Sequence, residues 1–125
     1  MTKITIPNSV TSIAWNAFFG CTRLTEINIP NSVTNLGSSA FEGCTGLTSI
    51  IIPDSVTSID FGIFRGCENL TEVIFKGTPN YISSYAFIEC PNLTTIRVPW
   101  SEGYFYDAPW GAENATIIYN YKEGE

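Results

Sequence analysis

Four cysteines mark the sequence at a constant interval of 23 residues: Cys21, Cys44, Cys67 and Cys90. A fixed period of this size is typical of repeat proteins, in which each unit is one turn of a solenoid that packs only on its neighbours. Aligned on this period, residues 24–46 and 47–69 share 11 of 23 positions. The same frame continues in residues 4–23, in residues 70–92 and in the start of a fifth unit at 93–99. The sequence therefore predicts a solenoid over residues 1–99, with about four full repeats and a fifth strand.

Each unit contains two extended stretches and a turn. Leu-Thr-x-Ile-x-Ile alternates apolar and polar residues, which predicts a short strand with one buried face. Proline closes this strand at Pro30, Pro53 and Pro99, because proline cannot donate a ladder hydrogen bond. Val-Thr-x-Ile is a second extended stretch, and Ala-Phe-x-Gly-Cys predicts a turn or a short helical return with Phe and Cys inward. Stacked units would bury a continuous core beneath five parallel strands, so the expected fold class is a β-rich solenoid.

The pattern L-x-x-I-x-I-P-x-S-V-T-x-I-x-x-x-A-F-x-G-C resembles the BspA-type leucine-rich repeat, over residues 2 to about 99. The resemblance implies a right-handed coil and a place at the cell surface or among secreted proteins of bacteria and some protozoa. It also implies adhesion to host proteins or to other microbes. The first ten residues, MTKITIPNSV, lack the regions of a signal peptide, so we expect the chain to be a fragment.

Residues 100–125 leave the repeat and carry many aromatic side chains. We expect an aromatic C-terminal cap that covers the last coil, with Ala-Thr-Ile-Ile-Tyr as a last strand; a carbohydrate-stacking platform is the alternative. Val-Pro-Trp-Ser-Glu-Gly and Ala-Pro-Trp-Gly-Ala are similar to a closing segment of bacterial and phage-borne members of the family. No such device covers the first coil, which predicts either a piece of a longer protein or a homodimer through the uncapped N-terminal coil.

Composition excludes several classes of function. The sequence has no histidine, which excludes His-based catalytic pairs and His-ligated metals. A net charge of −6 with six scattered basic residues disfavours nucleic acid, and no apolar run is long enough to span a bilayer. Cysteines one coil apart form a line, which cannot close a tetrahedral metal site, so we expect buried free thiols. We therefore expect neither a metal nor another cofactor.

The outward positions of the strands form the tentative ligand-binding face. Most of them are polar, as on a solvated sheet; the eight are Glu26, Asn28, Ser49, Ile51, Glu72, Ile74, Thr95 and Arg97. Ile51 and Ile74 are adjacent apolar exceptions, and either mark a contact patch or pack across strands in the ordinary way. Glu26 and Glu72 lie about 9.6 Å apart if coils are spaced by ~4.8 Å, near the separation of an inverting glycosidase pair. Solvated carboxylates are the simpler interpretation.

Two further sets of residues have a structural and a functional interpretation. Trp15, Phe61 and Tyr85 occupy turn positions, near Phe19 and Ile88, and either contact a partner or pack around the turn. Asn-x-Thr glycosylation sequences occur at Asn69, Asn92 and Asn114. The repeat explains the first two better than glycosylation does, because Asn-Leu-Thr belongs to the seam between units.

Three functions are compatible with this sequence. The first is a non-catalytic protein-binding or adhesion module whose partner is a host or microbial surface protein, with carbohydrate as a further ligand class. The second is a structural or attachment module of a larger surface or phage-virion assembly. The third, a carbohydrate-active enzyme that uses Glu26 and Glu72, has only their spacing in its favour.

Overall fold

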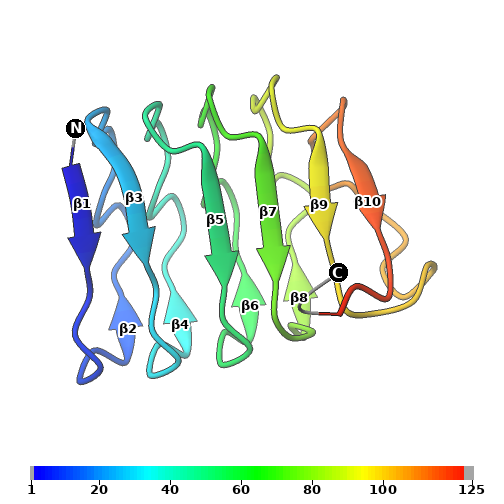
Figure 1. Cartoon of the computed structure of the whole chain (residues 1–125), viewed down its shortest axis with the longest axis horizontal. Helices are drawn as coiled ribbons and strands as arrows, with labels where there is room; N and C mark the ends of the chain where they lie inside the picture. The colour runs from blue at the N-terminus through cyan, green and yellow to red at the C-terminus, as the bar shows by residue number, and fades with distance from the viewer. Residues whose placement is uncertain (1, 123–125) are drawn as a thin grey trace.

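The computed structural model describes residues 2–122 and shows a solenoid of about five turns (Figure 1). One row of long parallel strands faces the viewer, and a row of two-residue strands lies behind it. The long row is β1 (Thr2–Thr5), β3 (Leu24–Asn28), β5 (Ser49–Ile52), β7 (Glu72–Phe75), β9 (Thr95–Arg97) and β10 (Thr116–Ile118). The short row is β2 (Ser12–Ile13), β4 (Asn35–Leu36), β6 (Ser58–Ile59) and β8 (Tyr81–Ile82).

The predicted register is confirmed. Ile4 lies opposite Ile27, and Ile50 lies opposite Val73, which in turn lies opposite Ile96. The returns are turns, because no helix occurs within residues 2–122. Gly43 lies at a tight turn with a φ of 74°, a backbone conformation that residues with a Cβ rarely adopt.

The predicted last strand at Ala-Thr-Ile-Ile-Tyr is confirmed: β10 pairs in parallel with β9 and adds a sixth strand to the long row. In one respect the row differs from the predicted continuous sheet. Among the described strands, β3 does not pair with β5 and β4 does not pair with β6, so both rows are interrupted between the second and third coils. Figure 1 shows the wider space between β3 and β5. We call this boundary the coil 2–3 seam.

The two sides of the second coil differ in how closely they pack. A Cβ on Gly46 would lie 2.7 Å from the Thr22 carbonyl oxygen, so glycine permits a close approach to the first coil. On the other side, the coil 2–3 seam keeps hydrogen bonds at the returns, where the Phe41 amide donates to the Ile63 carbonyl at 2.9 Å. The seam therefore retains its turn contacts and its core but loses strand pairing.

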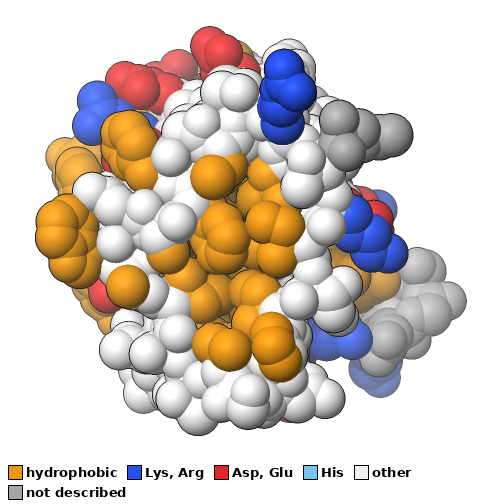
Figure 2. All heavy atoms as spheres, turned by 90° about the vertical axis from the view of Figure 1, so that its left-hand side faces the viewer, with side chains coloured by type: hydrophobic (Ala, Val, Ile, Leu, Met, Phe, Trp, Pro, Cys, Tyr) orange, Lys and Arg blue, Asp and Glu red, His pale blue; other side chains and the backbone are white. Residues whose placement is uncertain are grey.

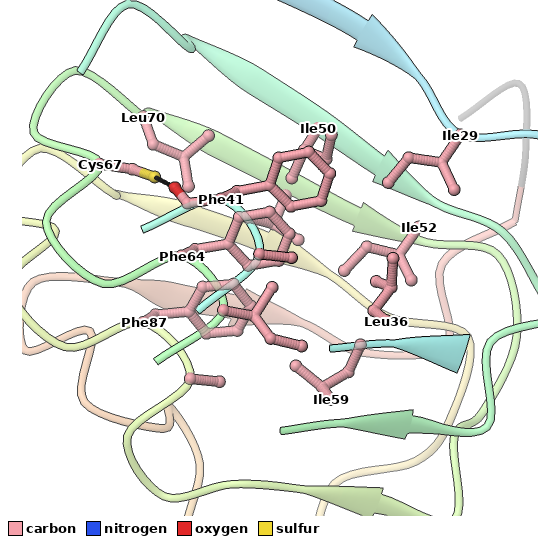
Figure 3. Close-up of a cluster of buried hydrophobic side chains, with 14 of the residues drawn as sticks. Ile29, Leu36, Phe41, Ile50, Ile52, Ile59, Phe64, Cys67, Leu70 and Phe87 are labelled. Carbon is pink, nitrogen blue, oxygen red and sulfur yellow. Dashed lines mark hydrogen bonds between the residues drawn. The ribbon is translucent and has the colours of Figure 1, made fainter. Parts of the chain in front are cut away.

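The core is a stack of equivalent side chains (Figure 3). Phe18, Phe41, Phe64 and Phe87 stack in sequence with ring centroids 5.3, 5.5 and 5.5 Å apart and rings within 7° of parallel. Full burial of each such ring is worth about 1.5–3 kcal/mol, and each stacked pair adds about 0.5–1.5 kcal/mol. The stack also measures the coil spacing, because each ring occupies the same place in its own repeat.

Candidate functional site

The outward face of the long strands is where the sequence placed the candidate site. Ser49, Glu72 and Thr95 lie side by side in one row across β5, β7 and β9. Ile51, Ile74 and Arg97 form the next row along the same strands. Glu26 and Asn28 lie on β3, beyond the coil 2–3 seam, and pair with Lys3 and Thr5 of β1. The structure therefore brings six of the eight residues together on one sheet and places two on another.

The apolar pair of this face borders a hollow. Ile51 is 49% exposed and Ile74 is half-buried. Both line a hollow of about 510 Å³ whose rim includes Asp54, Lys76 and Tyr121. An apolar floor with polar and charged groups around it is the arrangement of the centre and rim of a protein interface. We call this region the sheet-face hollow.

An ion pair fixes one side of the candidate face. The Arg97 Nε donates a hydrogen bond of 2.6 Å to Glu72 Oε2, and the guanidinium lies 5.4 Å from the centre of the Tyr121 ring. The hydrogen bond to Glu72 raises the pKa of the Arg97 guanidinium, so the arginine keeps its charge. Because both side chains are about one-third exposed, the pair orients the face more than it stabilises the fold.

The carboxylates considered for glycoside hydrolysis are both engaged with cations. Glu72 bonds Arg97, and Glu26 lies 3.6 Å from the ammonium group of Lys3. A general acid needs an apolar enclosure that keeps it protonated, whereas Glu26 is exposed and Glu72 only half-buried. They also stand on opposite sides of the coil 2–3 seam. The geometry does not favour hydrolysis.

A second, smaller hollow opens at the seam. It has a volume of about 260 Å³ and is lined by Lys3, Glu26, Asn28, Ser49 and Ile51 among others. Ile51 lines this hollow as well as the sheet-face hollow. The sequence pattern did not show this feature, because residues on both sides of the seam keep the repeat.

The cysteine column is a ladder of free thiols. From the second coil on, each Sγ donates to a carbonyl oxygen of the preceding coil: Cys44 to Phe18 at 3.1 Å, Cys67 to Phe41 at 3.2 Å and Cys90 to Phe64 at 3.0 Å. Burial raises the pKa of Cys44 and of Cys90 from 9.0 to about 11, and raises that of Cys67 as well. The prediction of buried free thiols is confirmed at these three positions, whereas Cys21 in the first coil is only half-buried. Within residues 2–122, no cluster of three potential metal ligands occurs.

The repeat geometry agrees with comparisons to known proteins. The profile of the family described as "BspA type Leucine rich repeat region" matches residues 1–108 in six copies. The chain belongs to the BspA-type leucine-rich repeat family.

Solved structures of bacterial leucine-rich repeat proteins have a similar fold. A leucine-rich repeat protein from Bacteroides ovatus is 29% identical with a TM-score of 0.74, over 95% of this chain and 30% of that one. A leucine-rich cell surface protein from Faecalibacterium prausnitzii is 29% identical with a TM-score of 0.62, over 80% of this chain and 32% of that one. A leucine-rich repeat protein from T. pallidum, 24% identical with a TM-score of 0.66 over 97% of this chain and 70% of that one, supports the fold alone. No curated protein matches the sequence.

This chain spans about a third of the length of the first two of these structures. The part of the chain that the structure describes contains no helix with the length and hydropathy needed to cross a bilayer.

The C-terminal segment closes the BspA-type stack. Trp100 and Trp110 are buried and contact each other and Phe75 of the fourth coil edge-on or tilted. Phe105 packs on both tryptophans. These described aromatic residues lie in the segment for which the sequence predicts an aromatic cap, and they pack on the fourth coil. The alternative for this segment was a platform on which sugars stack. Trp100 and Trp110 cannot belong to such a platform, because both side chains are buried.

At the opposite end of the BspA-type stack, none of the described residues covers the first coil (Figure 2). Hydrophobic side chains gather at the centre of this end, with polar groups and charges around the edge. Ile4, Val10, Phe18 and Cys21 of the first coil are only partly buried. Nothing lies within 4 Å of where a Cβ on Gly20 would point, whereas Gly43 has Gly20 at 3.6 Å. We call this end the N-terminal face.

The asparagines of the predicted glycosylation sequences hold neighbouring BspA-type coils together. Asn69, Asn92 and Asn114 each donate Nδ2 to a carbonyl of the preceding coil, at 2.8, 2.6 and 3.0 Å. The same amide nitrogen would carry a glycan, so its structural use explains why the motif recurs.

Proposed function

We propose that the chain is a non-catalytic module that binds a protein through the outward face of β5, β7 and β9. The observation that carries this proposal is the exposed Ile51 beside Ile74 in the sheet-face hollow. A solvated sheet has no need of adjacent apolar side chains in its outer row, whereas an interface centre does. Asp54, Lys76 and Tyr121 supply the polar rim, and the Glu72–Arg97 pair adjoins it through the Arg97 contact with Tyr121.

The partner in this proposal is a host or microbial surface protein, and the place of action is the cell surface or the secreted fraction. The F. prausnitzii relative is described as a cell surface protein, which supports this location. Membership of a repeat family that typically lacks catalysis supports a binding role over an enzymatic one. The net charge of −6 makes a basic partner surface the better electrostatic match.

The test uses an array of extracellular host proteins and microbial surface proteins, followed by affinity measurement on the hits. Ile51→Lys places a charge in the hollow and should weaken binding by at least about tenfold. Ile118→Lys is the matched control, because Ile118 lies opposite Arg97 in the same outer row, is 38% exposed and does not line the hollow. Equal affinity of Ile51→Lys and the unaltered protein would refute the proposal.

A second function is favoured by one observation, the N-terminal face. We propose that the chain also acts as an attachment module of a larger surface or virion assembly. In this proposal two copies of the chain associate through their N-terminal faces. The other end is covered by the cap, so head-to-tail growth is blocked and a two-fold dimer is the arrangement that closes. An edge strand such as β1 offers backbone groups to its symmetry mate.

Light scattering after size exclusion tests the second function. The chain should elute as a dimer, and Ile4→Lys should elute as a monomer because it charges the N-terminal face. Thr95→Lys, on the outward face far from this end, is the control and should stay dimeric. A monomer at the highest attainable concentration of the unaltered chain would contradict self-association and leave the sheet-face proposal intact.

A further inference from the structure

Four large aromatic side chains stand out from the returns, on turns away from the face of the long strands. Trp15, Phe19, Phe61 and Tyr85 are between 50% and 71% exposed. We call them the aromatic ridge. Each belongs to a turn of the type that buries Phe41, Phe64 and Phe87 and partly buries Phe18, so the fold packs one aromatic ring per turn inward and does not require a second. Packing around the turn, one of the two interpretations of the sequence, does not account for rings that are half or more exposed.

The ridge has a regular order along the solenoid axis. One position of the repeat reads Trp15, Ser38, Phe61 and Ser84 in successive coils, and Asp107 of the C-terminal segment lies beside Ser84. Backbone hydrogen bonds fix the alignment of the first three, since the Asn16 amide donates to the Ser38 carbonyl and the Ser39 amide donates to the Phe61 carbonyl. Aromatic rings therefore alternate with serine hydroxyls, coil by coil.

The spacing of this order is set by the core beneath it. Neighbouring rings of the buried phenylalanine stack are 5.3–5.5 Å apart, so Trp15 and Phe61 are offset by two such steps along the axis. Tyr85, in the next position of the repeat, brings its ring within 5.8 Å of Phe61 and widens the platform. At the end of the row, the Ser84 hydroxyl donates to Asp107 Oδ2 at 2.6 Å.

The chemistry of the row selects among ligand classes. It contains no lysine or arginine, so it offers nothing to neutralise phosphates. A pyranose has an apolar face of C–H groups, which packs on an aromatic ring, and an edge of hydroxyls, which bonds to serine and carboxylate oxygens. In an extended β-1,4-linked chain, one sugar advances by close to one coil spacing and successive sugars turn over. Every second sugar therefore presents the same face, which matches rings two coils apart with a hydroxyl between them.

We propose that the aromatic ridge binds an extended β-1,4-linked polysaccharide lying along the solenoid axis. Trp15 and Phe61 stack on alternate sugars, and Ser38, Ser84 and Asp107 bond the hydroxyls of the sugars between and beyond them. Because the ridge is exposed rather than recessed, it suits a polymer presented on a surface as well as a free chain. The site is separate from the sheet-face hollow, so it goes beyond the proposed protein contact.

The tryptophans make this proposal directly measurable. All three lie within the described residues, and only Trp15 among them is exposed, so a ligand-induced change in emission reports on the ridge. Cellohexaose and chitohexaose should shift the emission, whereas maltohexaose, whose α-1,4 linkages curl the chain, should not. Sedimentation with microcrystalline cellulose or chitin tests the polymer form.

Variants distinguish the ridge from other aromatic surface. Trp15→Ala and Phe61→Ala should each weaken oligosaccharide binding by at least about tenfold, measured by calorimetry. Tyr106→Ala is the matched control, because Tyr106 is fully exposed in the cap and outside the row, and it should bind like the unaltered protein. Each altered side chain is at least half exposed, and circular dichroism confirms that each variant is folded.

Three outcomes would overturn the proposal. The first is no binding of any β-1,4-linked chain, and the second is equal binding of maltohexaose, which would mean unselective stacking. The third is a protein partner that binds the unaltered chain but not Trp15→Ala, while neither binds any polysaccharide. This result would make the ridge a protein interface. None of these outcomes bears on the Ile51 test, so failure here is distinguishable from failure of the sheet-face contact.

Discussion

The same residue types are buried to different extents at the two ends of the solenoid. Phe87 and Cys90 in the fourth coil are buried, whereas Phe18 and Cys21, at the same places in the first coil, are only partly buried. The difference comes from what lies next to each coil: Trp110 packs on Phe87, and nothing described packs on the outer side of Phe18. Burial in this fold is therefore set by place in the stack and not by residue type alone.

The largest effect on stability should come from removing the Trp110 ring, which packs at the covered end of the solenoid. Trp110→Ala leaves a cavity beside Phe75 and Phe87 and should lower the free energy of unfolding by about 3–5 kcal/mol in urea denaturation. Trp15→Ala, which removes an exposed tryptophan, should change it by no more than about 0.5 kcal/mol. Similar losses in both variants would mean that the C-terminal segment does not close the core.

The equivalent phenylalanines of the two end coils compare the ends directly. Phe87→Ala should lower the free energy of unfolding by about 3–5 kcal/mol, because the ring is enclosed on both sides. Phe18→Ala should cost clearly less at a concentration where the chain is monomeric, because that ring contacts only Phe41 in the stack. Equal costs in chemical denaturation would show that the N-terminal face is enclosed in solution.

Thiol reactivity should follow the same gradient. In the folded protein Cys21 should react with iodoacetamide at least about ten times faster than Cys90, because Cys90 is buried and burial raises its pKa to about 11. Peptide mapping by mass spectrometry gives the order of labelling. Uniform labelling at all four positions before unfolding would contradict the buried ladder.

The raised thiol pKa values also give a pH dependence. The unfolded thiols ionise near 9.0, while Cys44 and Cys90 stay protonated in the fold up to about 11. Their contribution to stability is therefore complete below pH 9 and is lost as the pH rises from 9 towards 11. Alanine in place of Cys44 and Cys90 should flatten this decline in denaturation measured across that range.

The smallest expected effect concerns the asparagine bonds between coils. Asn92→Ala removes the 2.6 Å bond to the Glu68 carbonyl and should cost about 0.5–1.5 kcal/mol. Arg23→Ala, at the same repeat position near the N-terminal face, should change the thermal midpoint little. A large change in the thermal midpoint of Arg23→Ala would contradict this interpretation, because it would mean that another coil or molecule packs on the N-terminal face and contacts Arg23.

The repeat allowed most of the fold to be predicted. A period of 23 residues fixes which side chains lie opposite each other, so the strand register, the phenylalanine stack and the thiol ladder all follow from the spacing of Cys21, Cys44, Cys67 and Cys90. An aromatic cap was predicted because an uncovered last coil would leave apolar side chains open to association. The packing of Trp100 against Trp110 was not, because the tail has no repeat to align it.

Features that break the repeat were beyond reach of the sequence. The coil 2–3 seam lies between two units that match each other well, and the asparagine bond across it is kept by Asn69, so nothing in the repeat pattern marks that boundary. The repeat indicates which residues of the strands point outward, yet it does not show the sheet-face hollow, because Tyr121 reaches the hollow from the end of the chain. Exposure of the aromatic ridge likewise depends on the exact course of each turn.

The coil 2–3 seam has a mechanical consequence. A module that holds two surfaces together is pulled, and tension applied at the N-terminus must be carried from coil to coil. Parallel strand pairs share such a load among several hydrogen bonds, but β3 with β5 and β4 with β6 do not pair among the described strands. The first two coils should therefore part from the rest as one unit, at a lower force than any later step. Single-molecule stretching would show this as an early release of two coils together, and release of one coil at a time would contradict it.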